Sequence, residues 1–131
     1  MDGQLTQFLG SLAAILALAG IAWWLKLGPE RRLESEDEAR RAAQEAVDGF
    51  DPVHVALDRG GRGALLVDHG GRVLLLRAHG THFAGRILTP SARAQLVDRT
   101  IEVDPADRRF GSVRLDIADA PAWVRRIEAI V

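Results

Sequence analysis

The sequence predicts an α+β protein: a single N-terminal transmembrane helix, a short helix, and a six- to seven-stranded antiparallel meander or partly open barrel closed by a C-terminal helix. Three observations predict this order. An uncharged apolar run lies near the N-terminus, apolar and polar residues alternate between glycine-rich turns from Asp51 onward, and the last residues repeat with helical spacing. We expect a transmembrane anchor at 1–27, a linker and juxtamembrane helix at 28–50, and the strand-rich soluble domain at 51–131.

The anchor runs from Phe8 to Leu25 and contains no charged residue. At 1.5 Å per residue, about 18 to 20 apolar residues nearly cross a hydrocarbon core of roughly 30 Å. Only a helix satisfies all backbone groups of such a segment inside lipid. Trp23 and Trp24 stand at its C-terminal boundary, where aromatic rings favour the headgroup level, and Lys26 follows them.

The charges on the two flanks predict the orientation. Lys26, Arg31 and Arg32 follow the anchor, whereas residues 1–7 contain no lysine or arginine. Because positive flanks stay in the cytoplasm, we expect a single-pass protein of the inner (plasma) membrane with a cytoplasmic soluble domain. The alternative is a cleaved signal peptide, for which Ala17 to Ala19 would serve as the cleavage site, although a basic start is absent.

Small residues line one side of the anchor, and small residues let transmembrane helices approach closely. The sequence therefore also predicts self-association through this side, which is formed by Gly10, Ala14, Ala17 and Gly20.

The juxtamembrane helix begins at Ser35. Ser35 and Glu38 have the spacing of a capping box, in which each side chain accepts the other residue's backbone N–H. Alanines form a narrow apolar stripe from Ala39 to Ala46, and Gly49 is suited to end the helix. We expect this helix to pack lightly on the next domain; the alternative is a partner-binding surface near the bilayer.

The strand-rich domain is predicted from a period of two and from its turns. The apolar run Val73–Leu76 indicates a strand buried on both faces, Gly85 indicates a bulge, and Asp98–Arg99 is either a hairpin turn or part of one continuous strand. The expected strands are 53–57, 64–67, 73–76, 83–88, 95–97, 100–103 and 109–117.

The final helix has Asp119 as its expected N-cap and Pro121 in its first turn. Its apolar face carries Trp123, Ile127 and Ile130, followed by Val131, and we expect the first three to anchor the helix on the sheet.

The order of strands first and then a closing helix with a tryptophan resembles the pleckstrin-homology-like barrel over Val53 to Val131. In the lipid-binding members of that family, basic residues cluster between the first strands. Here Arg59, Arg62 and Arg72 stand beside aspartates, so we expect solvated turn residues. The whole chain also resembles small bacterial single-pass membrane proteins of uncharacterised function, a resemblance that implies no activity.

Composition excludes several function classes. The absence of cysteine excludes disulfides, thiolate catalysis and zinc–cysteine sites. Sixteen arginines and one lysine are interleaved with acidic residues, and the net charge is −1, so we expect no nucleic-acid partner. We expect no cofactor.

Histidines provide an alternative function: a small metal-dependent enzyme or hydrolase with a site around His69, His79 and His82. A catalytic zinc site needs three protein ligands plus water, but Gly80 places a turn between His79 and His82, and no carboxylate is adjacent to that pair. The main expectation is therefore a non-enzymatic, membrane-tethered module with no catalytic or metal residue, which binds a protein partner near the bilayer.

Overall fold

The computed structural model describes residues 2–26 and 32–131 and divides the chain into two compact units, Met1–Glu30 and Arg31–Val131. The first unit contains helix α1 (Asp2–Lys26), which lies within the expected anchor 1–27 and begins before its apolar stretch Phe8–Leu25. The first part of the expected linker, residues 28–31 with the basic residue Arg31, lies outside the described residues.

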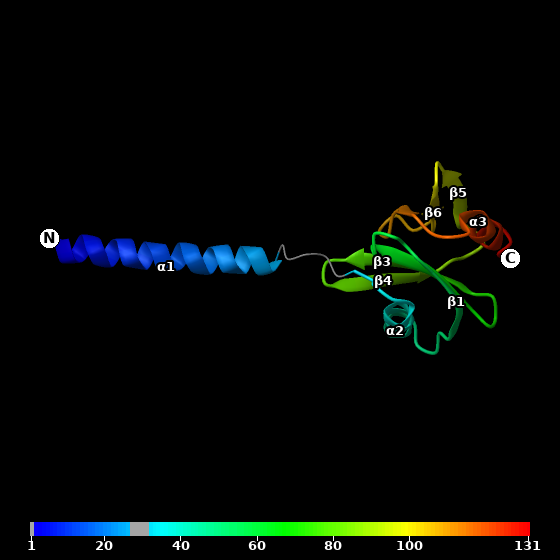
Figure 1. The fold of residues 1–131 in the computed structure, drawn as a ribbon, viewed down its shortest axis with the longest axis horizontal. Coiled ribbons are helices and arrows are strands. Elements are labelled where there is room, and N and C mark those ends of the chain that lie inside the picture. The colour runs from blue at the N-terminus through cyan, green and yellow to red at the C-terminus, as the bar shows by residue number, and fades with distance from the viewer. Residues whose placement is uncertain (1, 27–31) are drawn as a thin grey trace. The chain divides into compact units, whose positions relative to one another are not determined.

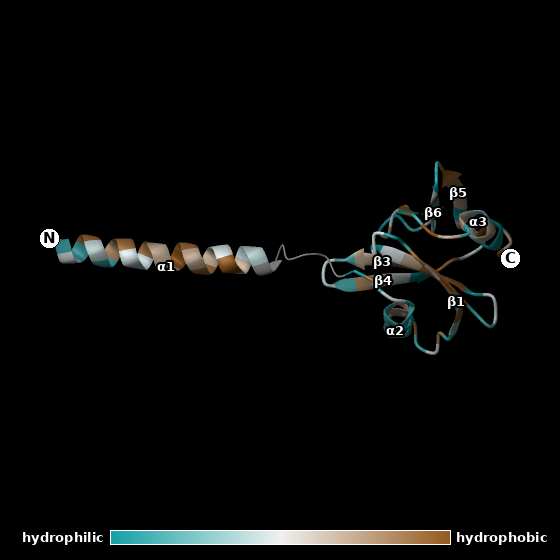
Figure 2. Ribbon diagram, viewed as in Figure 1, coloured by the Kyte–Doolittle hydropathy of each residue, from teal (hydrophilic) through white to brown (hydrophobic). Residues whose placement is uncertain are grey.

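The large apolar side chains of helix α1 are exposed, and Figure 2 shows apolar residues recurring along the helix. Its segment Asp2–Trp24 is long and apolar enough to cross a membrane, by length and composition, and none of its most apolar window is buried. A signal sequence near an N-terminus has the same properties. The helix therefore has the length and composition of a membrane anchor or of a signal sequence.

The second unit contains two helices and seven strands in two antiparallel sheets (Figure 1). The first sheet has the order β1-β2-β3-β4 and the second has the order β5-β6-β7. The elements are α2 (Glu36–Ala46), β1 (Pro52–Leu57), β2 (Gly63–Asp68), β3 (Val73–His79), β4 (His82–Ile87), β5 (Arg93–Val97), β6 (Thr100–Asp104), β7 (Val113–Leu115) and α3 (Ala120–Glu128).

The expected barrel is not formed, because the strands divide into two separate sheets. All residues of β2 and the first four of β3 are buried, so both faces of the central strands need an apolar cover. A barrel would leave one face of each strand outside. Two layers cover them instead: Figure 1 shows α2 on one side of the first sheet and β5, β6 and α3 on the other.

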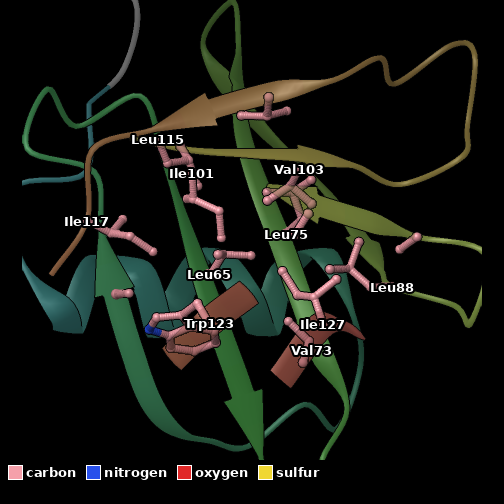
Figure 3. Packing of buried hydrophobic residues seen from close by; sticks show 14 of the residues in the cluster. Leu65, Val73, Leu75, Leu88, Ile101, Val103, Leu115, Ile117, Trp123 and Ile127 are labelled. Atoms are coloured by element: carbon pink, nitrogen blue, oxygen red, sulfur yellow. The ribbon is translucent and has the colours of Figure 1, made fainter. Parts of the chain in front are cut away.

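Two hydrophobic clusters result. The larger cluster joins one face of the first sheet to the second sheet and α3, with Leu65, Leu75, Ile101, Leu115 and Trp123 among its members (Figure 3). The smaller cluster joins the opposite face to α2 and contains Leu33, Ala39, Ala42, Ala43, Phe50, Ala64, Leu66, Leu74 and Leu76. The expected burial of Val73–Leu76 on both faces is confirmed.

Helix α2 has the expected serine cap, but the returning bond of the capping box goes to Glu34 and not to Ser35. Ser35 Oγ accepts the N–H of Glu38 at 3.2 Å, whereas the Glu38 carboxylate accepts the N–H of Glu34 at 3.0 Å. The helix packs closely, because Ala39 and Ala43 are fully buried. A Cβ added at Gly85 would lie 2.8 Å from Ala46 Cβ, and β3 and β4 pair in unbroken register there. The expected bulge at Gly85 is therefore wrong. The absence of a side chain at Gly85 leaves room for the end of α2 to pack against β4.

At the turns, one open alternative is decided and two expectations change. Asp98 has φ 55 and closes a β5–β6 hairpin, so these strands are not continuous. The Asp107 carboxylate accepts the N–H groups of Arg109 and Phe110 in a turn, which delays the last strand to Val113. Asp119 precedes α3 with φ 55, but its side chain does not cap the helix.

Candidate functional site

A groove of about 500 Å³ runs along the free edge of β1. Strand β1 stands at one end of the sheet order, with β2 as its neighbour. The groove has β1 as its floor, the beginning of α2 as one wall, and the beginning of α3 with the residues before it as the other. Its lining residues are Glu36, Arg40, Val53, His54, Val55, Ala56, Leu57, Ala118, Asp119, Ala122, Trp123 and Arg126.

The pairing of β1 shows which backbone groups face the groove. The Asp58 N–H donates to the Gly63 carbonyl at 3.0 Å, which makes these two residues a hydrogen-bonded pair. Such pairs alternate along antiparallel strands, so Ala56 also directs its backbone groups toward β2, where it lies opposite Leu65. Val55 lies between these positions.

By the same alternation, the N–H and C=O groups of Val55 and Leu57 point away from β2. The next outward position agrees, because the Arg59 N–H donates to the Asp116 carbonyl at 2.9 Å. At the other end, the register shifts between Pro52 and His54, and the Arg40 guanidinium donates to the Pro52 carbonyl.

Both ends of the edge are therefore occupied by the protein's own groups, and the middle is open. Among the residues that the structure describes, no group accepts from or donates to the outward backbone of Val55 or Leu57. Two N–H donors and two C=O acceptors thus face the groove at a two-residue spacing.

The walls carry two arginines that are already engaged. Arg40 donates to Pro52, and the Arg126 guanidinium lies over the Trp123 ring, 4.7 Å from its centroid. The two wall carboxylates, Glu36 and Asp119, are exposed and have no hydrogen bond or ion pair within 32–131. The groove is therefore electrically mixed: its two carboxylates have no partner in this part of the chain, and the exposed imidazole of His54 lines it as well.

The candidate histidines do not form one cluster. His79 and His82 face each other across the β3–β4 hairpin, whereas His69 lies in the turn before β3, at the opposite end of that strand. His69 Nε2 lies 3.7 Å from the Asp51 carboxylate, and both side chains are exposed. Within the described residues, no group of three histidine, aspartate or glutamate side chains is placed to hold a metal ion.

Two of the three turn arginines form ion pairs. Arg72 Nε lies 2.6 Å from the Asp68 carboxylate, Arg59 Nε lies 3.7 Å from that of Asp116, and Arg62 is exposed. Burial by itself raises the pKa of Asp68, but the Arg72 side chain and the nearby N–H groups of Arg72 and Gly70 hold that pKa below its ordinary value.

The other expected site residues lie in two places. On α1, the Phe8 side chain is 63% exposed and those of Trp23 and Trp24 are 66% exposed. The side chains of Leu25 and Lys26 lie outside the description.

In the second unit, Trp123 and Ile127 are buried in the larger cluster, and Ile130 packs against it beyond the end of α3. Val131, expected on the same face, is exposed.

The groove was not predicted from the sequence. The alternation of Val53, Val55 and Leu57 predicts a strand but not its place at a sheet edge, which depends on the later strands. The Pro52 at the start of the strand was the available signal, because proline within sheets is confined to edges, strand starts and bulges.

No protein-family model, curated protein or solved structure matches this chain.

Proposed function

We propose that this protein is a membrane-tethered, non-enzymatic interaction module whose groove along β1 binds a protein partner near the bilayer. In this proposal α1 is retained as a single-pass anchor of the inner membrane, and the second unit lies in the cytoplasm. The observation that carries the proposal is the unpaired middle of β1, which lies in a groove between two helices.

Tethering explains how so small a surface is sufficient. A module fixed to the membrane meets membrane-bound partners at a raised effective concentration, so weak binding in solution becomes substantial at the bilayer. The Lys26 and Arg32 flank supports the cytoplasmic placement.

The alternative, a metal-dependent enzyme or hydrolase at His69, His79 and His82, has less support. His69 lies at the other end of β3 from the histidine pair, so the three imidazoles do not converge on one reacting centre.

Site-specific photo-crosslinking tests the proposal in the cells from which the sequence comes. A photoreactive residue replaces Ala118, which is exposed and lines the groove, and the control carries it at Ser112, which is exposed and does not line it. We expect a discrete heavier adduct in the membrane fraction for position 118 alone. Identical adducts at both positions, or no adduct at 118, would contradict the proposal.

A further inference from the structure

The open part of β1 requires a ligand with a particular backbone. Val55 and Leu57 each present one N–H and one C=O, two residues apart, toward the groove. An extended chain offers complementary groups at the same spacing, whereas a helix has already used its backbone groups internally. The edge therefore selects an extended segment.

The walls exclude a second copy of this edge. Residues of α2 and of the 118–126 region stand on both sides of β1, so the edge is recessed. Two equally recessed edges would bring their walls into collision before their strands came within the spacing of about 4.8 Å that pairing requires. A single extended segment has no walls and can enter.

The free side chains select the charge. Arg40 and Arg126 are held by Pro52 and by the Trp123 ring, while the Glu36 and Asp119 carboxylates have no partner among the residues described. A lysine or arginine on the incoming strand would find a free acceptor on either wall. An acidic segment would bring like charge toward Glu36 and Asp119, and it could bind only the N–H groups that Arg40 and Arg126 leave free.

From these observations we propose that an extended, basic segment of the partner protein adds to β1 as a fifth strand of the first sheet. The inference rests on the proposed function and names the chemistry of the partner. Alternate residues of the added strand donate and accept at Val55 and Leu57, and a basic side chain binds Glu36 or Asp119.

The test uses the full-length protein in nanodiscs of neutral lipid and fluorescent six-residue peptides of alternating valine and arginine. One peptide is N-methylated on its odd residues and another on its even residues. Because only alternate residues of an added strand bond to the edge, we expect one pattern to weaken binding by about tenfold and the other by less than about twofold. A peptide with glutamate in place of arginine should bind about tenfold more weakly.

A pair of proline variants provides the matched control in the protein. Val55→Pro removes an N–H that faces the groove, and Ile87→Pro makes the same change on the opposite edge strand, β4. The Leu88 N–H donates to the Val73 carbonyl, so the backbone N–H and C=O of the neighbouring residue, Ile87, point away from β3. Both residues are half-buried against the smaller cluster. We expect Val55→Pro to weaken binding by about tenfold and Ile87→Pro to leave it unchanged.

Several outcomes would overturn the inference. These are no saturable binding of any peptide up to about 1 mM, equal effects of the two methylation patterns, or tighter binding of the acidic peptide. A dimer by light scattering that Val55→Pro dissolves would assign the edge to a second copy instead. The methylation comparison needs no protein variant, so it stands if Val55→Pro fails to fold. If the crosslink at position 118 forms while both methylation patterns act equally, strand addition fails and the proposed function stands.

Discussion

Two buried aspartates organise turns of the second unit, and each is satisfied by the backbone. Asp58 accepts the Arg62 N–H at 3.1 Å and the Asp116 N–H at 2.8 Å, which links the β1–β2 turn to the chain after β7. Asp68 accepts the N–H groups of Gly70 and Arg72 in the β2–β3 turn, at 3.0 and 2.8 Å. At these turns the carboxylate oxygens accept backbone N–H groups that have no carbonyl partner on a neighbouring strand.

The lowered pKa of Asp68 predicts a pH-dependent effect of Asp68→Asn. Folding favours the charged carboxylate, so its stabilisation is complete above the unfolded-state pKa and is lost as pH falls through the lower folded-state pKa. At pH 7 we expect the variant to lose at most about 1 kcal/mol, because Arg72 is half exposed and solvent screens the pair. Urea unfolding from about pH 7 to pH 2 should show this difference disappearing in acid. A pH-independent difference would show that the charge of Asp68 contributes nothing.

Trp123 is the large aromatic residue of α3, and 4% of its surface is exposed. Trp123→Ala should lower the free energy of unfolding by about 3 to 5 kcal/mol. Most domains have a free energy of unfolding of roughly 5 to 15 kcal/mol, so this is a large part of the total. Arg126→Ala, which removes only the cation over the ring, should cost about 0.5 to 1 kcal/mol.

Fluorescence provides a second readout in a background where Trp23 and Trp24 are replaced by phenylalanine. Emission from Trp123 should be blue-shifted in the native protein and move to the red on unfolding. A native spectrum like that of tryptophan in water would mean that the α3 helix is not anchored through this side chain.

At the scale of elements, the contact between α2 and β4 depends on two small residues. A methyl group at Gly85 would meet Ala46 Cβ at 2.8 Å and the side chains of Leu74 and Leu76 at 3.3 Å. Gly85→Ala should therefore displace the end of α2 and cost about 1 to 3 kcal/mol. Adding Ala46→Gly should recover part of that loss, although it weakens the helix by about 1 kcal/mol on its own. Additive effects in this double-mutant cycle would contradict the proposed contact.

The same contact shows what could and could not be predicted from the sequence. Local patterns located all seven strands and the Ser35 cap, because alternation and capping depend on neighbours in the chain. The role of Gly85 depends on Ala46, which is distant in sequence, so the pattern indicated a bulge. The β1 groove has the same origin, since α2 and α3 form its walls only after the sheets have assembled. The apolar runs Ala64–Val67 and Val73–Leu76 were local signals of a layered fold in place of a barrel.

At the scale of the whole molecule, the basic flank of α1 predicts the orientation. A reporter fused after Val131 should be active only if it is a type that works in the cytoplasm. Because the chain contains no cysteine, a single cysteine at exposed Gly70 provides an independent readout with a membrane-impermeant thiol reagent. Labelling of intact spheroplasts before lysis would reverse the assigned orientation or indicate a cleaved signal sequence.

The boundary between the two units predicts which fragments fold without α1. The second unit begins at Arg31, and Leu33 already belongs to it: its side chain is 4% exposed in the smaller cluster, and its N–H donates to the Gly61 carbonyl at 2.9 Å. A fragment of residues 31–131 should therefore be soluble and unfold cooperatively. A fragment that begins at Ser35 keeps both sheets and both helices but loses this contact, so it should be less stable by about 2 to 5 kcal/mol. Leu33→Ala in the longer fragment is the matched control and should reproduce most of that loss. Equal unfolding midpoints for the two fragments would show that the Leu33 contact does not stabilise the unit. A 31–131 fragment without a cooperative transition would mean that the unit depends on the membrane or a partner.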